Sequence, residues 1–392
     1  MTTASANEAI PRTPSELRDA LMDLAATMSD VISLGLGDPD LATPPHIIAA
    51  AKGAMDRGDL GLTPPAGLPE LRRAIAAKLH RENGIDVDPM REVIVTTGGQ
   101  EALFLIMAAI IDPGDEILVP DPRYSSYDDA IEMAGGRMVF VPSDEAHDFD
   151  LDPAEVEARI TPRSRAILYV SPSNPTAGMV SPSNIRRIAQ IAQDHDLVVI
   201  SDEIYEHYVY DDAEHLSIAS LPGMKERTIT VNGASKTFAM TGFRIGYVAG
   251  PAHVVDAMVR LKAVINVAAP TISQWAVVAA LNGPQECVEE MRQTYAARRS
   301  LLLAALDRMG FTYGAPRGAL YVWANSASTG IPSTELSYRF LTEGRVLIFP
   351  GTGFGDQWFD YMRITLLQPI DILEEAARRM EDVIARYRKG AE

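Results

Sequence analysis

One lysine and one arginine lie close together in the stretch GASKTFAMTGFRIGY, residues 233–247. Lys236 follows Ser235 directly, and Arg244 comes a short way downstream. The rest of the stretch is too apolar and too rich in glycine to form a solvated charged face, which suggests a chemical role for the amine and the guanidinium. A solvated surface lysine is the alternative interpretation of Lys236.

Other polar residues follow apolar runs that have the composition of strands. Gly98-Gly99-Gln100 follows VIVTT (93–97) and opens a helix, where free backbone N–H groups suit a phosphate, although such a glycine pair is often purely structural. Asp202 follows LVVIS, and a carboxylate that leaves a buried strand needs a cation or several donors, unless it caps the next helix. Asn174-Pro175 follows AILYV (166–170) and is also compatible with a simple turn.

The apolar runs themselves predict the fold. From about residue 46 they alternate with helical segments, and most are apolar throughout, as in parallel strands buried on both faces. We expect an α/β fold: a large domain with a mostly parallel, doubly wound sheet flanked by helices, plus a smaller α/β domain from the two chain ends. Ligands bind beyond the carboxyl ends of such strands. The expected strands of the large sheet are VIVTT, EILVP, AILYV, LVVISDE, TITVNG and RIGYVAG.

The same pattern divides the chain. Residues 1–45 are expected to join the small domain, 46–285 to form the large ligand-binding domain, and 286–392 to form the rest of the small domain. Thr13 and Glu16 form a capping-box pattern, which predicts a helix that begins directly after Thr13.

The composition excludes several function classes. A net charge of −18 disfavours nucleic acid as a partner, because phosphate binding needs clustered Lys and Arg. The chain has a single cysteine, Cys287, which excludes an internal disulfide and a thiolate zinc site and fits a reducing cytoplasm. We interpret Cys287 as a residue that fills the core. We see no signal peptide in the first residues and no run of roughly 18 apolar residues that would span a membrane. We therefore expect a cytoplasmic protein without a metal site.

Together the motifs resemble the class I and II aminotransferase family of fold-type-I pyridoxal-phosphate enzymes, over essentially the whole chain. The core of the resemblance is Asn-Pro, then Asp-Glu-x-Tyr, then Ser-Lys-x-x-x-x-x-Gly-x-Arg, in this order at strand ends. Further matching stretches are GDPDLATP (37–44), TPPAGLPELR (63–72), DPRYSSY (121–127), PRGALYVW (316–323), PGTGFG (350–355) and MRITL (362–366). The resemblance implies a homodimer with active sites at the interface, which transfers an amino group from an L-amino acid to a 2-oxo acid by a ping-pong mechanism.

The resemblance also implies roles at the cofactor, pyridoxal 5'-phosphate. Lys236 would form a Schiff base with the cofactor aldehyde, which requires a neutral amine, and would then move the Cα proton of the substrate. Asp202 would pair with the pyridine nitrogen and keep it protonated. Tyr205 and Asn174 would hydrogen-bond the phenolic oxygen of the ring. Tyr124 would stack on the ring, with a plain core tyrosine as the alternative.

The remaining matches concern the cofactor phosphate and the substrate. The implied phosphate ligands are Gly99, Gln100, Ser235 and Arg244. Arg363 would grip the substrate α-carboxylate, to which Asn174 would also bind, although a structural salt bridge is the alternative for Arg363. Gly37 would let backbone and substrate approach closely.

One position departs from the family pattern. The family usually carries a tyrosine ahead of TPPAGLPELR that reaches the phosphate of the partner subunit, whereas this chain reads Gly61-Leu62. The stretch 261–274 is apolar apart from Lys262 and has no arginine that could bind a second carboxylate of the substrate. This pattern disfavours an enzyme that is strictly specific for aspartate. Two other functions stay open: a β-eliminating carbon-sulfur lyase and a non-catalytic cofactor-binding regulator.

Overall fold

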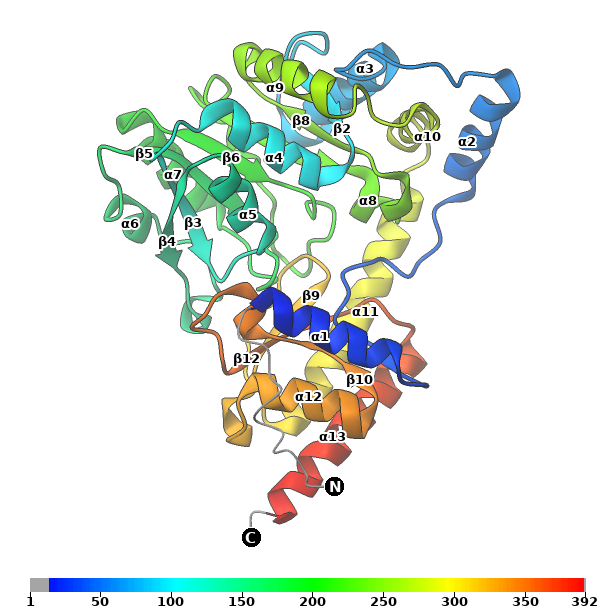
Figure 1. Cartoon of the computed structure of the whole chain (residues 1–392), viewed down its shortest axis with the longest axis vertical. Helices are drawn as coiled ribbons and strands as arrows, with labels where there is room; N and C mark the ends of the chain where they lie inside the picture. The colour runs from blue at the N-terminus through cyan, green and yellow to red at the C-terminus, as the bar shows by residue number, and fades with distance from the viewer. Residues whose placement is uncertain (1–13, 391–392) are drawn as a thin grey trace.

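The computed structural model describes residues 14–390, with side-chain surroundings for residues 17–387. Helix α1 (Pro14–Ala26) opens the described residues. The capping box predicted at Thr13 lies outside them, as does the amino-terminal stretch in which we expect no signal peptide, so both stay predictions. Figure 1 shows a larger upper body and a smaller lower one, with helix α11 (Glu286–Met309) running between them. The domain boundaries after residues 45 and 285 stay a prediction.

A seven-stranded sheet in the order β2-β8-β7-β6-β5-β3-β4 forms the centre of the larger body. Its strands are β2 (Val93–Thr96), β3 (Glu116–Asp121), β4 (Arg137–Pro142), β5 (Ser164–Val170), β6 (Val198–Asp202), β7 (Thr228–Gly233) and β8 (Gly246–Ala249). Neighbouring strands are parallel, except that β8 is antiparallel to both β2 and β7. The sheet is therefore mostly parallel, as the apolar runs predict.

Strand β4 is absent from the expected strands. It pairs with β3 alone at the edge of the sheet, and only one of its residues, Val141, is fully buried. An edge strand has one neighbour and a half-exposed surface, so it needs no long apolar run. The short run Met138–Val141 was too weak a pattern to identify it.

Helices cover both faces of this sheet, as in a doubly wound fold. Ile167 and Leu168 are adjacent on β5 and point to opposite faces, where they join different hydrophobic clusters. The face of Leu168 is covered by α4 (Gly98–Ile110), α5 (Ser126–Met133) and α9 (Ala252–Ile265). The other face is covered by α6 (Pro153–Glu157), α7 (Pro182–Asp194), α2 (Pro45–Arg57), α3 (Pro69–Lys78) and α10 (Thr271–Asn282). Cys287 is only partly buried and lies at the margin of the cluster on this second face, so it is not the fully buried core-filling residue that we expected.

The smaller body joins the two chain ends. Strand β1 (Ile32–Ser33) pairs in parallel with β10 (Val346–Leu347). Beside them, β11 (Phe349–Pro350), β12 (Tyr361–Thr365) and β9 (Tyr321–Asn325) form an antiparallel sheet in that order. Helices α1, α12 (Ser333–Gly344) and α13 (Ile370–Gly390) pack around these strands. The expected smaller α/β unit is therefore present.

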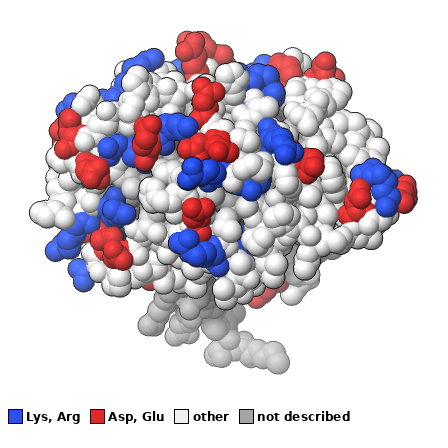
Figure 2. Space-filling model, turned by 90° about the horizontal axis from the view of Figure 1, so that it is seen from above, with Lys and Arg blue, Asp and Glu red and all other residues white. Residues whose placement is uncertain are grey.

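Short helical turns complete the fold. They are α8 (Ala234–Thr237), a π-helical turn (Leu79–Asn83) and 3-10 turns at Glu145–His147, Ile218–Ser220, Thr241–Phe243, Ala327–Thr329 and Gly351–Phe354. Figure 2 shows one face of the molecule, on which acidic and basic side chains are interspersed instead of being gathered by sign. Among residues 14–390, no helix combines the length and the hydropathy that a membrane crossing needs.

Candidate active site

A cavity of about 1240 Å³ lies beyond the carboxyl ends of β5, β6 and β7, where the smaller body faces the sheet. The strand ends contribute Val170, Asp202 and Val231 to its wall, and the smaller body contributes Tyr321 and Arg363. Every predicted site residue lines this cavity: Gly37, Gly99, Gln100, Tyr124, Asn174, Asp202, Tyr205, Ser235, Lys236, Arg244 and Arg363. Residues far apart in sequence thus meet where the fold class predicts a ligand.

Lys236 lies in the single-turn helix α8, directly after β7 ends at Gly233. Its side chain is partly buried, and Nζ donates a hydrogen bond to the carbonyl oxygen of Gly37. Burial, together with the nearby cations of Arg363 and Arg244, lowers the pKa of Lys236 to about 8, against the opposing effect of Asp38. The neutral amine is therefore reached at a lower pH than in a solvated surface lysine.

Asp202 ends β6 and is buried. Its carboxylate accepts a hydrogen bond from the hydroxyl of Tyr127 at 2.9 Å and one from the backbone N–H of Ile204 at 3.2 Å. No Lys, Arg or His within residues 17–387 forms an ion pair with it, and burial raises its pKa to about 6. The carboxylate therefore faces the cavity without the cation that a buried charge requires. Tyr127 was not predicted as a site residue, although it ends the matching stretch DPRYSSY.

Arg363 is a buried cation without a carboxylate partner among the described residues. Its Nη1 donates to Asn174 Oδ1 at 2.9 Å, and its Nη2 donates to the carbonyl oxygen of Gly35 at 2.6 Å. The guanidinium carbon lies 4.6 Å from the ring centre of Tyr321 and 4.7 Å from that of Phe354. Neutral acceptors and aromatic rings orient the guanidinium but leave its charge uncompensated, so an anion can bind. Among residues 17–387, Arg363 therefore does not form the structural salt bridge that was the alternative for it.

Two tyrosines connect the wall of the cavity to the smaller body. The hydroxyl oxygens of Tyr205 and Tyr321 lie 2.7 Å apart, and burial raises the pKa of Tyr205 well above its usual value. Tyr321 also limits the space at Gly37, because a Cβ atom on residue 37 would lie 2.6 Å from the hydroxyl oxygen of Tyr321. Tyr321 was not singled out from sequence, although GALYVW belongs to the matching stretches. Gly37 is therefore needed for a close approach, here to a tyrosine.

The start of α4 lies beside Arg244. Gly98 has φ +80°, and a Cβ at this position would lie 2.6 Å from Nη2 of Arg244. Glycine suits this backbone conformation, and a side chain here would require the end of Arg244 to move. Gly98 was not among the predicted site residues; it does not line the cavity itself but lies against Arg244, which does, and its place in the pair Gly98-Gly99 was the available sequence signal.

Gln100 and Tyr124 lie together on the same side of the cavity. Nε2 of Gln100 donates to the hydroxyl of Tyr124 at 2.7 Å and to Oγ of Ser126 at 3.1 Å. The ring of Tyr124 packs edge-on against Tyr127 at 5.6 Å between centroids. Tyr124 is only partly buried and lines the cavity, so it is not a plain core tyrosine.

Leu62 does not contribute to the cavity wall. Its side chain is 85% exposed, in a loop where Gly61 accepts a hydrogen bond from the hydroxyl of Thr271 at 2.7 Å. Val264, in α9, is 88% exposed.

Comparison with known proteins identifies one family. The family described as "Aminotransferase class I and II" matches residues 29–380. An aspartate aminotransferase from Pyrococcus abyssi is 45% identical to this chain over 374 residues, which cover 95% of this chain and 96% of the relative. Aromatic-amino-acid aminotransferase 2 from Thermococcus litoralis is 42% identical, with the same coverage of 95% and 96%.

Solved structures have the same fold. The aromatic aminotransferase from Pyrococcus horikoshii OT3 superposes with a TM-score of 0.90 at 43% identity, covering 94% of this chain and 99% of that one. The aspartate aminotransferase from Thermus thermophilus with maleate superposes with a TM-score of 0.89 at 38% identity, covering 98% and 100% of the two chains. The α/β fold class and the family resemblance are confirmed.

Proposed function

Since the chain belongs to the class I and II aminotransferase family and is an aminotransferase, we propose that it moves the amino group of an L-amino acid to a 2-oxo acid by a ping-pong mechanism, with pyridoxal 5'-phosphate as cofactor. One observation supports the proposal most directly. A lysine with a lowered pKa, a buried carboxylate without a cation and a buried arginine without a carboxylate line the same cavity. These groups are complementary to an aldehyde, a cationic ring nitrogen and a substrate carboxylate.

The cofactor, when bound, supplies an electrophilic carbon and a cationic ring that accepts electron density. Lys236 would hold it, and the free Nζ would then take the proton from the substrate Cα as a general base and return it as an acid. The carboxylate of Asp202 would stay ionised against the ring nitrogen, in a place that Tyr127 already orients. Tyr205 and Asn174 would lie at the phenolic oxygen. Tyr124 would cover one face of the ring.

The two ends of the cavity would bind the two anions. The groups proposed for the cofactor phosphate are Gly99, Gln100, Ser235 and Arg244. Because the side chain of Gln100 is bonded to Tyr124, its backbone N–H at the start of α4 is the group left for the phosphate. Arg363, oriented by Asn174, would grip the α-carboxylate of the substrate, next to the space that Gly37 leaves open.

We further propose a cytoplasmic homodimer with active sites at the interface. The apolar side chains of Leu62 and Val264 are almost fully exposed, and a second copy of the chain would cover them. Leu62 cannot donate a hydrogen bond to a phosphate of the partner subunit, so this contact has to come from another group or be absent. The single cysteine fits a reducing compartment, and the net charge of −18 disfavours nucleic acid.

The direct test is a panel of amino donors and 2-oxo acid acceptors, with the absorption spectrum of the bound cofactor followed through the first half reaction. The relatives are named for aspartate and for aromatic amino acids, so both classes belong in the panel. Transamination requires that a donor converts the cofactor to its amine form and that an acceptor restores it. Release of pyruvate and ammonia without an acceptor would instead identify the carbon-sulfur lyase. A spectrum that no donor changes would favour the non-catalytic regulator.

Replacing Arg363 by glutamine is expected to lower kcat/KM about 100- to 1000-fold, chiefly through KM. A bidentate, charge-assisted contact to the α-carboxylate would be lost, and each such hydrogen bond contributes about 1.5–3 kcal/mol. Arg299→Gln is the matched control, because Arg299 is also buried but binds Asp211 away from the cavity. Equal KM values for the two variants would contradict the proposed role.

Replacing Gly98 by alanine is expected to weaken the affinity for pyridoxal 5'-phosphate at least about tenfold. The methyl group would displace Arg244, and the positive φ adds about 1–2 kcal/mol of backbone strain. Gly58→Ala is the control, because Gly58 has a similar φ of +77° and no atom within 4 Å of the added Cβ. Spectroscopic titration of both variants with the cofactor checks this: strain alone would destabilise both without a difference in affinity.

A further inference from the structure

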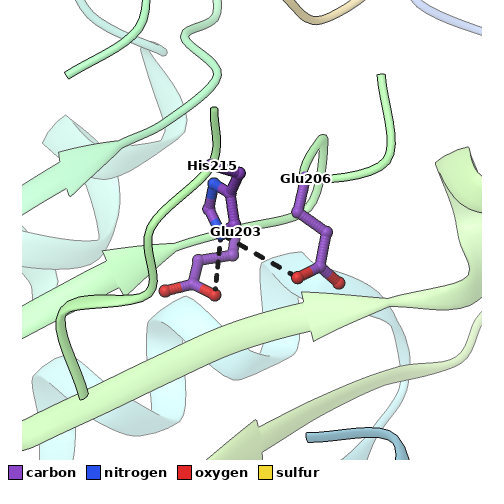
Figure 3. A group of neighbouring side chains, drawn as sticks. All are labelled: Glu203, Glu206 and His215. Carbon is purple, nitrogen blue, oxygen red and sulfur yellow. Dashed lines mark hydrogen bonds and ion pairs between the residues drawn. The ribbon is translucent and has the colours of Figure 1, made fainter. Parts of the chain in front are cut away.

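A buried polar network lies behind the turn that carries Asp202 and Tyr205. These two residues line the cavity, whereas Glu203 and Glu206 of the same turn do not and are buried on its other side. Figure 3 shows the carboxylates of Glu203 and Glu206 and the ring of His215 directed toward one another. Nε2 of His215 lies 3.2 Å from Glu203 and 3.9 Å from Glu206.

Glu206 is the centre of this network. Its carboxylate accepts hydrogen bonds from the ammonium of Lys78, from Nδ2 of Asn83 at 2.5 Å and from Nδ2 of Asn232 at 2.5 Å. Lys78 ends α3, Asn83 ends the π-helical turn, and Asn232 lies in the last part of β7. One side chain thus joins its own turn to two segments that are distant in sequence, residues 78–83 and β7.

The charge of Glu206 is compensated within the network. Burial alone would raise the pKa of Glu206, but Lys78 and the two neighbouring histidines lower it, so the carboxylate stays ionised. The ligand atoms of Glu203, Glu206 and His215 lie within 4.8 Å of one another, a spacing that a metal ion would accept. However, Lys78 already places its ammonium on Glu206, and Ser217 donates to Glu203 at 2.6 Å. A lysine in this place acts as the cation, which argues against a metal.

The network is connected to two segments that line the cavity. Glu203 and Glu206 alternate with Asp202 and Tyr205 in one turn. Oδ1 of Asn232 accepts a hydrogen bond from the N–H of Gly233 at 2.7 Å, at the point where β7 passes into α8 with Ser235 and Lys236. Because the two segments share Glu206, a shift of one would be transmitted to the other.

From this geometry we infer that Glu206, held by Lys78, Asn83 and Asn232, is a positioning residue that fixes the Asp202–Tyr205 turn relative to the segment that carries Lys236. The inference rests on the proposed function, since it concerns the distance between the group that would hold the cofactor and the group that would pair with its ring. It assigns no contact with substrate or cofactor to Glu206 itself.

The test compares Glu206→Gln with Glu116→Gln. Glu116 is a buried glutamate at the amino-terminal end of β3, where it accepts hydrogen bonds from Thr161 and Arg163 and does not line the cavity. In the cofactor-free protein, Glu206→Gln is expected to speed hydrogen exchange at least about tenfold in residues 202–206 and 232–236, and to weaken pyridoxal 5'-phosphate binding about tenfold. Glu116→Gln is expected to change neither the exchange rates of these segments nor the cofactor affinity, although both variants are expected to have a lower melting temperature than the wild type.

The opposite result is equally defined. If Glu206→Gln loses thermal stability like the control but keeps wild-type exchange in both segments and wild-type cofactor affinity, the network is only structural and the inference is wrong. If Glu206→Gln does not fold, Asn232→Ala is the second variant: it removes the hydrogen bond to Glu206, together with the one from Gly233, without leaving a buried charge unpaired. The same two readouts apply to it. Exchange in the cofactor-free protein does not depend on catalysis, so failure of the proposed function would leave this result interpretable.

Discussion

Replacing Lys236 by alanine is expected to reduce the rate of amino transfer at least about 10⁴-fold. The variant loses the amine that would hold the cofactor and the group that would move the Cα proton, and general acid-base catalysis alone contributes about 10²–10⁴-fold. Single-turnover kinetics with the best donor of the panel measure the loss. In the wild type, borohydride treatment after addition of the cofactor is expected to label the peptide that contains Lys236.

The same variant is expected to remain folded at neutral pH. Burial lowers the pKa of Lys236 from 10.5 to about 8, so the folded chain binds this proton less tightly than the unfolded chain does. The resulting penalty is fully present below pH 8 and disappears as the pH rises through 10.5. Removing the amine should therefore relieve the cofactor-free protein at pH 7 of a charge-burial penalty of up to about 3 kcal/mol, which offsets the loss of the remaining side-chain contacts. Activity within a factor of about ten of the wild type would overturn the role of Lys236.

Replacing Asp202 by asparagine is expected to lower kcat about 10³-fold and to weaken cofactor binding. Asparagine keeps the shape of the side chain but cannot supply the negative charge that would hold the ring nitrogen in its cationic form. Breaking a buried ion pair by removing one partner costs about 3–5 kcal/mol, which corresponds to this loss. The variant is measured by steady-state kinetics and by titration with the cofactor.

Tyr127→Phe separates the charge from its orientation. The variant leaves the carboxylate of Asp202 in place and removes only the hydrogen bond of 2.9 Å, so we expect a loss of about tenfold. A Tyr127→Phe variant as inactive as Asp202→Asn would show that the hydrogen bond, not the charge, carries the effect. Wild-type kinetics for Asp202→Asn would exclude a role for the charge.

Much of the site was predictable because its residues stand in patterns that neighbouring residues along the chain define. The runs that become β5, β6 and β7 are apolar throughout, since they are buried on both faces, and parallel strands bring their carboxyl ends to one edge. Asn174, Asp202 and Lys236 each follow one of these runs directly or within a few residues. Their convergence in one cavity could be inferred before any coordinate was known, whereas the edge strand β4, held on one side only, could not.

The amino-acid sequence by itself determined the fold class, the family and the list of residues around the cavity, because apolar runs and motif spacing are properties of neighbours along the chain. Only the tertiary structure decided the partners of those residues: Arg244 against Gly98, Tyr321 against Gly37, and Glu206 between Lys78 and Asn232. These contacts join positions that no local pattern relates, and they form only when the packed core brings the segments within a few ångströms. Their geometry and the electrostatics of burial lower the pKa of one lysine and leave one carboxylate and one arginine uncompensated.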